Sequence, residues 1–281
     1  MSEKKRYMIH CDLEGISGVV RQDQVNPSKP SYNTGQKLFM AEVKKLVEGL
    51  HEGGAEEIYL YDHHYFGTNI DIMAMPAYSK VICGKPLYKD NWTGEKNSPY
   101  TGVILLGFHS KSETPGGLLA HSYEHDIKDI RVNGFSVGEI GMEAAIAGEF
   151  GVPVLLVTGD SEGIKEAEKI ISNIRSVVVK ESVDFHSAVC YPMEHNAERI
   201  KNAAKEIAQS PPNVNLFKFD SPIKLEVELY DTPFLKMMEK HYGEVFKGSS
   251  NVVTLDGEKL AGCWKKYIER KLHCLSELEG R

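Results

Sequence analysis

The stretch DIRVNGFSVGEIGMEAAIAGEFGVPVLLVTGDSEG, residues 129–163, indicates the fold class more directly than any other part of the chain. It predicts, in turn, a short strand, a turn through Gly138 and Glu139, a helix of about ten residues, and the apolar strand VPVLLVTGD at 152–160. A strand that is apolar on both faces is typical of a parallel sheet with helices on either side. The stretch therefore favours an α/β fold.

The same alternation continues towards the N-terminus and beyond residue 163. Phe39, Val43, Leu46 and Leu50 recur at helical spacing in NTGQKLFMAEVKKLVEGLHEGG, which ends on two glycines. We therefore expect a mainly parallel sheet with helices on both faces, forming one domain over residues 1–183. Further strands are predicted in the first apolar run, which ends in HCDLEGISGVV (10–20), and in EEIYLYDHH (56–64), YTGVILLGFHS (100–110) and RSVVVKES (175–182).

The pattern changes from about Asp184, and we predict a smaller α+β domain over residues 184–281. An amphipathic helix is expected at 193–210, two strands around a turn at 211–231, and a closing helix at 256–275. The closing helix carries apolar residues near one stripe, which we assign to the core: Leu260, Trp264, Tyr267 and Leu272.

The overall composition is that of an ordinary globular protein, with 281 residues, 41% of them apolar and 26% charged. A net charge of -7 argues against broad binding of nucleic acid or of anionic membranes, because both need a basic surface. The basic start MSEKKRYMIHCDLEG leads into a short apolar run that His10, Asp12 and Glu14 interrupt. We therefore expect neither a signal peptide nor a membrane span there.

The five cysteines are scattered, odd in number and without a CxxC pair. This usage fits a reducing compartment and argues against a zinc site made of thiolates. We therefore expect a cytoplasmic protein in which histidines and carboxylates hold any metal ion.

Ionisable residues stand at the ends of several predicted strands. Ligands of open α/β sheets bind outside the carboxyl ends of the strands, so these positions are expected to share one rim. Asp12 and Glu14 end the first strand, and side chains at i and i+2 of a strand share a face about 7 Å apart. The other such residues are Asp62, His63 and His64 after the second strand, His109, Asp160, and Glu139 at a turn that opens a helix.

Two imidazoles and three carboxylates suit zinc or a similar divalent ion. A pair of metal ions about 3.5 to 4 Å apart needs a bridging carboxylate and a few terminal ligands, and Asp12 is the candidate bridge. The remaining candidates are Glu14, His109, Glu139 and one of the adjacent histidines, of which His63 and His64 are equally eligible.

Each candidate also has a purely structural explanation. Asp12 and Glu14 could form the polar end of a strand, and His109 could cap one by hydrogen bonding. Glu139 could complement a helix dipole, and Asp160 could be a helix N-cap. These explanations do not predict that so many ligand-type residues share one rim, so the set as a whole favours a metal site.

The loop HSKSETPGGLLAHSYEH, residues 109–125, has a turn-forming centre at 114–117 that permits close approach of the backbone to a ligand. It reaches His121, with His125 four residues later. Because the ordinary pKa of histidine is about 6.5, His121 could act as general base, nucleophile or oxyanion stabiliser. A hydrogen-bonded loop histidine is the alternative.

The segments DLEGISG, DHH, LGFHSKSETPG, HS at 121–122, VNGFSVGEIGMEA and VPVLLVTGD together resemble the DppA-type D-aminopeptidases, a family of zinc-dependent peptidases. The resemblance covers residues 7–180 well and the C-terminal third more loosely. It places Asp12, Glu14, His64, His109 and Glu139 at the zinc-ligand positions and His121 at the position of the catalytic histidine. It also implies a two-domain protomer, a binuclear zinc centre and a ring-shaped homodecamer.

The expected activity is metal-dependent hydrolysis of the N-terminal residue of a short peptide or amino amide, with D-amino-acid peptides among the candidates. Two alternatives stay open from the sequence. DLEGISG and TGDSEG imitate motifs of magnesium-dependent phosphatases of the haloacid-dehalogenase type, although Glu14 replaces the second Asp of that pattern. A non-catalytic small-molecule-binding α/β protein is the other, since fold alone does not specify activity.

Overall fold

A computed structural model describes residues 4–84, 94–95 and 98–278 of the chain. Its largest element is a seven-stranded sheet in the order β11-β10-β9-β6-β1-β2-β3, parallel throughout except for the antiparallel pair β10–β11. The expected mainly parallel α/β architecture is therefore confirmed. The strands are β1 (Arg6–Cys11), β2 (Glu57–Asp62), β3 (Ser79–Ile82), β6 (Gly102–Phe108), β9 (Val154–Asp160), β10 (Arg175–Asp184) and β11 (Ser187–Cys190).

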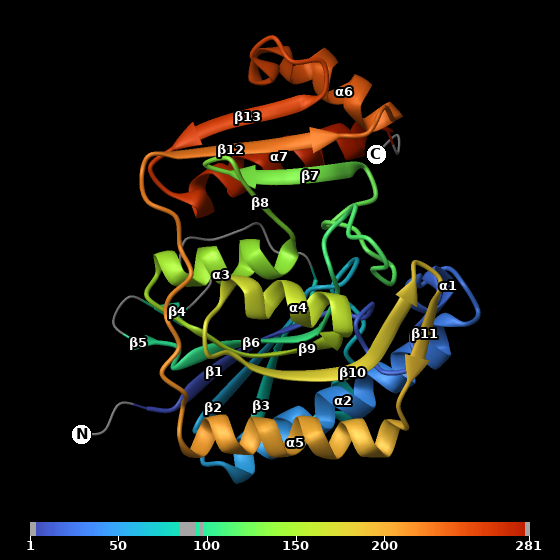
Figure 1. Cartoon of the computed structure of the whole chain (residues 1–281), viewed down its shortest axis with the longest axis vertical. Coiled ribbons are helices and arrows are strands. Elements are labelled where there is room, and N and C mark those ends of the chain that lie inside the picture. Colours follow the sequence, from blue (N-terminus) through green and yellow to red (C-terminus); the bar gives the residue numbers. More distant parts are fainter. Residues whose placement is uncertain (1–3, 85–93, 96–97, 279–281) are drawn as a thin grey trace.

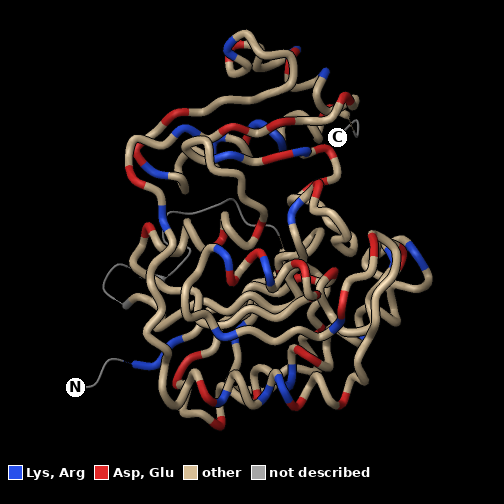
Figure 2. The backbone as a smooth tube through the Cα atoms, viewed as in Figure 1, with Lys and Arg blue, Asp and Glu red and all other residues tan. Residues whose placement is uncertain are grey.

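Helices cover both faces of this sheet (Figure 1). On one face lie α2 (Tyr32–Glu52) and α5 (Met193–Gln209), and on the other lie α3 (Glu139–Glu149) and α4 (Ser161–Ile170). The predicted helical stripe lies on α2, and its four residues are fully buried: Phe39, Val43, Leu46 and Leu50. Figure 2 shows charges of both signs along α5, where Lys201 joins the two helices through Glu48 at 2.6 Å and Glu52 at 2.7 Å.

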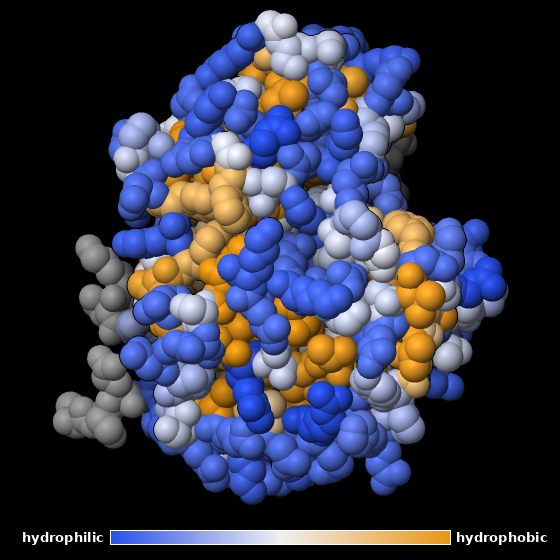
Figure 3. All heavy atoms as spheres, viewed as in Figure 1, coloured by the Kyte–Doolittle hydropathy of each residue, from blue (hydrophilic) through white to orange (hydrophobic). Residues whose placement is uncertain are grey.

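A second, antiparallel sheet lies beyond α3 and α4 in the order β13-β12-β7-β8 (Figure 1). It forms a separate apolar cluster that includes Met142 and Ile146 of α3 together with Trp264 and Tyr267. In Figure 3 apolar residues show in patches over both layers and between them. The elements of this layer are β7 (Ile127–Val132), β8 (Phe135–Val137), β12 (Ile223–Leu229), β13 (Val252–Gly257), α6 (Pro233–Tyr242), a 3-10 helix η2 (Gly243–Phe246) and α7 (Leu260–Leu278).

The two layers do not follow a single division of the sequence at residue 184. The hairpin β7–β8, which comes from the first half of the chain, pairs with β12 of the second sheet. Conversely, α5 packs on the main sheet beside α2, although it follows residue 184. The division into domains at residues 1–183 and 184–281 therefore stays a prediction.

Two details of the predicted C-terminal part are wrong. Residues 211–231 contain one strand, β12, where two were expected. The segment before it holds Pro211, Pro212 and Pro222, which have no backbone N–H to donate to a sheet. Leu272 is 43% exposed, because at 3.6 residues per turn it lies about 120° around α7 from Leu260.

Several short elements complete the described chain. None of the helices in the described ranges combines the length and the apolar character needed to span a bilayer. The short elements are α1 (Gln22–Val25), a 3-10 helix η1 (Ile72–Ala74), and the two-stranded pair β4 (Gly94–Glu95) and β5 (Ser98–Pro99).

The loop after β1 is held tightly against the sheet. Gly15 lies so close to β6 that a Cβ atom there would stand 2.0 Å from the Phe108 carbonyl oxygen, so only glycine fits. The buried Lys180 of β10 donates hydrogen bonds to the carbonyl oxygens of Glu14 (2.5 Å), Ile16 (2.8 Å) and Val19 (2.5 Å). One ammonium group therefore fixes the path of the whole loop that carries Asp12 and Glu14.

A buried carboxyl group lies under the same loop. Glu42 of α2 accepts hydrogen bonds from the hydroxyl and the backbone N–H of Ser17, while its Oε2 has no hydrogen-bond partner among the described residues. Burial raises the pKa of Glu42 to about 7, against the opposing effects of Ser17 and of the charge on Lys180. The folded chain therefore holds this proton at pH values where the unfolded chain has released it.

Glu42 should make stability depend on pH. Because the pKa of Glu42 is higher in the folded chain than in the unfolded chain, the contribution of this group to folding stability is complete below pH 4.5. This contribution is lost as the pH rises through 7. We expect Glu42→Gln to leave the free energy of unfolding nearly unchanged at pH 5 and to raise it by up to about 3 kcal/mol at pH 8. Urea unfolding of both proteins at the two pH values measures this, and an equal difference at both would contradict the prediction.

Candidate metal centre

Five ionisable side chains from four separate segments meet at the carboxyl edge of the main sheet. Asp12 and Glu14 follow β1, His64 follows β2, and His109 follows β6, while Glu139 is the first residue of α3. These strands are neighbours in the order β6-β1-β2, so their ends adjoin. All five side chains are at most 5% exposed.

Asp12 lies at the centre of the group. Its Oδ1 is 3.1 Å from Nδ1 of His64, and its Oδ2 is 3.5 Å from Nε2 of His109. On one side, Glu14 Oε2 is also 3.1 Å from Nδ1 of His64. On the other, Glu139 Oε1 is 3.4 Å from Nε2 of His109. The two oxygens of Asp12 therefore face two different imidazole–carboxylate pairs, which is the arrangement that a bridging ligand needs.

The backbone orients each imidazole. Nε2 of His64 lies 2.7 Å from the Val25 carbonyl, and Nδ1 of His109 lies 2.9 Å from the Ser110 carbonyl. A carbonyl only accepts, so these nitrogens carry the protons. The other nitrogen of each ring is thereby left facing the carboxylates, as in histidine ligands whose second nitrogen is held by a backbone group.

The charges at the centre are strongly coupled. Burial, reinforced by Glu14, raises the pKa of Asp12. Burial works against ionisation of Glu139, yet the imidazole of His109 holds its pKa at about 2. Burial opposes protonation of His109 in the same way, and Glu139 outweighs it and raises the pKa to about 10. The five side chains thus form a charged centre from which burial largely excludes water.

The donor atoms fit a divalent cation. Glu14 Oε2 and His109 Nε2 are buried, and neither makes a hydrogen bond to any described residue despite their close neighbours. Two sets of ligand atoms lie within 4.8 Å of one another here: Asp12, Glu14 and His109, and His109, His121 and Glu139. Nitrogen and carboxylate oxygen donors in this number suit zinc.

His121 lies at the edge of the centre, on the loop between β6 and β7. Its Nδ1 is 2.9 Å from the Leu119 carbonyl, and its ring stacks on His109 with centroids 4.2 Å apart. Its Nε2 is thereby turned inwards, 3.9 Å from Oε1 of Glu139. The structure thus brings this residue to the same centre as the five predicted ligands.

The adjacent histidines point in different directions. His64 faces Asp12 and Glu14, whereas Nε2 of His63 lies 3.4 Å from Glu143 and its Nδ1 lies 3.7 Å from Glu139. The geometry therefore favours His64 as the ligand, and His63 contacts Glu143 and the Oε2 atom of Glu139 instead.

The structure reveals a further group of buried polar side chains next to Glu139, which was not predicted from the sequence: His10, Tyr123 and Glu143. Glu143 lies one helical turn after Glu139, and its carboxylate is 2.9 Å from Nδ1 of His10 and accepts a hydrogen bond from the Tyr123 hydroxyl at 2.8 Å. The backbone N–H of Tyr123 in turn donates to Glu139 at 2.6 Å. The spacing of Glu139 and Glu143 on one helix face was the available signal.

Two acids predicted on the same rim have other roles. Asp160 caps α4 and accepts from the backbone N–H groups of Glu162 (3.0 Å) and Gly163 (3.1 Å). Asp62 organises the loop after β2 by accepting from the backbone of Asn69 and Ile70. The phosphatase-like TGDSEG motif therefore has a structural explanation as a helix cap.

A third group of ligand type lies away from the sheet, where α6 and α7 meet. It consists of His241, His273 and Glu277, and the last two are exposed. Lys240 is 3.6 Å from the same Glu277 carboxylate and already supplies a cation there. The buried group at the sheet edge is the better candidate for a metal centre.

The chain is similar to known D-aminopeptidases in sequence and in fold. The model of a family described as D-aminopeptidase matches residues 6–261. A D-aminopeptidase of Bacillus subtilis (strain 168) is 28% identical over 219 residues, which cover 74% of this chain and 78% of that protein. The solved structure of the Zn-dependent D-aminopeptidase DppA from Bacillus subtilis, described as a self-compartmentalizing protease, superposes with a TM-score of 0.84 at 23% identity. The match covers 96% of this chain and 98% of that one, and it shows a shared fold.

Proposed function

Since this chain belongs to the D-aminopeptidase family and is a metal-dependent aminopeptidase, we propose that a pair of zinc ions is its cofactor. The ligands in this proposal are Asp12, Glu14, His64, His109 and Glu139. The observation that carries it is the position of Asp12 between two imidazoles that the backbone has turned towards it. Glu14 and His64 would hold one ion, His109 and Glu139 the other, with Asp12 between them.

The proposed reaction is hydrolysis of the bond after the N-terminal residue of a short peptide or amino amide, with D-amino-acid peptides as the first candidates. When bound, the metal pair would activate water and polarise the scissile carbonyl. His121 is the proposed catalytic residue: its inward Nε2 can take a proton from the attacking water and deliver one to the leaving amine. The Leu119 carbonyl keeps the proton of the neutral ring on Nδ1 and leaves Nε2 as the acceptor.

A screen of aminoacyl substrates tests this function. D-alanyl and L-alanyl p-nitroanilides should be hydrolysed in the presence of zinc, and a chelator should remove turnover until metal is restored. Elemental analysis of the untagged protein should give about two zinc ions per chain. Absence of chelator-sensitive turnover on every aminoacyl substrate would contradict the proposal, and absence of bound metal would favour a non-catalytic binding protein.

We further propose that the protein forms a homo-oligomer, specifically a ring-shaped homodecamer, and that it is located in the cytoplasm. The described surface carries large apolar side chains on the segment after β2: Phe66 is 64% exposed, Ile72 55% and Met73 98%. Large exposed apolar side chains occur at protein–protein contacts. The five cysteines are all free, as a reducing compartment requires.

A further inference from the structure

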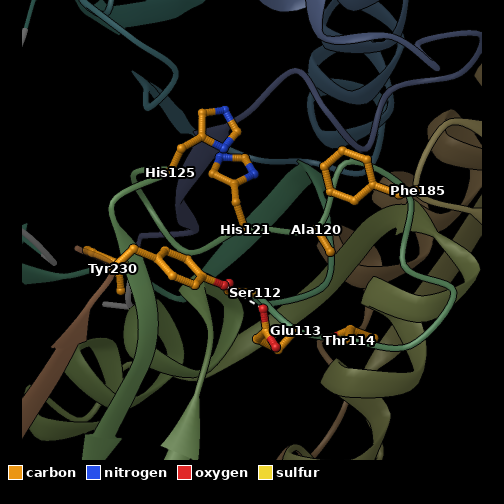
Figure 4. Close-up of a pocket in the computed structure, with 9 residues that line it drawn as sticks. Ser112, Glu113, Thr114, Ala120, His121, His125, Phe185 and Tyr230 are labelled. Atoms are coloured by element: carbon orange, nitrogen blue, oxygen red, sulfur yellow. Dashed lines mark hydrogen bonds between the residues drawn. The ribbon is translucent and has the colours of Figure 1, made fainter. Parts of the chain in front are cut away.

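A cavity of about 280 Å³ opens beside the proposed metal centre, between the main sheet and the second sheet. His121 lines it, so the cavity begins at the residue to which we assign proton transfer. In Figure 4, His121 and His125 lie together on one side of it, and Glu113 and Thr114 lie on the other. A substrate bound at the metal centre would therefore have one of its substituents directed into this space.

The walls of the cavity combine carbon surface with polar groups. Ala120, Ile127, Phe185 and the ring of Tyr230 contribute carbon surface. Glu113 contributes a carboxylate, and the described lining includes no lysine or arginine. A cavity that offers carbon surface together with a carboxylate suits a long side chain with methylene groups and a terminal cation.

Glu113 is held in place for such a role. The hydroxyl of Tyr230, which follows β12, donates a hydrogen bond to its Oε1 at 2.5 Å, joining the two layers across the cavity (Figure 4). The backbone of Glu113 has a φ of 63°, a conformation that side-chain-bearing residues adopt infrequently and that often marks functional sites. Lys128, the cation nearby, is already paired with Glu228 at 3.0 Å. The carboxylate is thus oriented and exposed, and no lysine in the described part of the chain forms an ion pair with it.

We propose that this cavity binds the side chain of the substrate's N-terminal residue and that Glu113 selects a cationic side chain, that of lysine, arginine or a shorter homologue. The inference rests on the proposed aminopeptidase function and adds the class of substrate. The methylene groups would lie along Phe185 and Ile127, and the terminal cation would reach Glu113. The α-amine and the scissile carbonyl would stay at the metal centre beside His121.

Specificity constants test the selection. For the D and L series, kcat/KM should be about 10-fold higher for lysyl than for leucyl or alanyl p-nitroanilide, as one charge pair at a partly exposed site allows. Glu113→Gln should lower the lysyl value about 10-fold and leave the alanyl value within about twofold. Glu181→Gln is the matched control, because Glu181 is another exposed carboxylate bonded to a tyrosine hydroxyl, that of Tyr191, and lies outside the cavity.

Binding gives a second readout that does not depend on turnover. Lysinol should bind more tightly than norleucinol, which differs in lacking the terminal ammonium, and Glu113→Gln should remove the difference. Neither amino alcohol carries an amide bond that the proposed reaction could cleave. An equal loss on lysyl and alanyl substrates would overturn the inference, because Glu113 would then serve the α-amine or the loop. Equal binding of the two amino alcohols to the unaltered protein would also overturn it. Turnover without basic selectivity would leave the aminopeptidase function standing.

Discussion

Asp12→Asn is expected to remove hydrolysis of every aminoacyl substrate and to lower the zinc content from about two ions per chain to one or none. The reason is geometric: the two oxygens of Asp12 face His64 and His109 separately, so this side chain is shared between the two halves of the centre. An amide offers one neutral oxygen in place of two charged ones and cannot bridge two cations in the same way. Elemental analysis and alanyl p-nitroanilide turnover measure the two effects.

Asp160→Asn is the matched control. Asp160 is also a fully buried aspartate at the carboxyl end of a strand of the same sheet, but it caps α4. Asparagine is as good an N-cap as aspartate, so zinc content and turnover should change little. Full zinc content and full activity in Asp12→Asn would show that the metal is held elsewhere.

The rim itself was predictable from the sequence because it follows from topology. Once residues 129–163 indicate a parallel sheet, the carboxyl ends of its strands must lie on one edge, and Asp12 and His109 come together without knowledge of any side-chain contact. Glu139 follows β8 of the second sheet, so its place at this edge does not follow from the same rule. Which of two adjacent histidines faces inwards was not predictable from the residues. Consecutive side chains point in different directions, and the turn after β2 alone decides that His64 meets Asp12.

The contact between His10 and Glu143 and the antiparallel second sheet were harder to predict, for the same physical reason. His10 and Glu143 approach each other through a helix–sheet contact, whose register depends on packing rather than on local pattern. The hairpin β7–β8 carries an ordinary strand pattern, and its partner β12 lies about ninety residues further along. A pairing over such a distance leaves no local signal, so the hairpin's place outside the parallel sheet could not be read from residues 129–137.

His121→Ala is expected to lower kcat by about 10²- to 10⁴-fold while the zinc content stays unchanged. The ring is held by the Leu119 carbonyl on one side and stacked on His109 on the other, so its Nε2 is fixed next to Glu139 without being one of the five central groups. Loss of a positioned proton acceptor slows the chemical step, whereas the central ligands remain intact. Steady-state kinetics together with elemental analysis separate the two contributions.

Rescue and control sharpen this prediction. Since the cavity beside His121 opens where the ring is removed, added imidazole should restore part of the activity of His121→Ala. His51→Ala is the control, because His51 is an exposed histidine whose ring also stacks on an aromatic ring, that of Tyr78, with centroids 3.8 Å apart. It lies at the C-terminal end of α2, just before the start of β2, and not at the carboxyl end of a strand. If His121→Ala instead lost zinc, the residue would be a metal ligand, as its grouping with His109 and Glu139 permits, and the proton would have to move through another group.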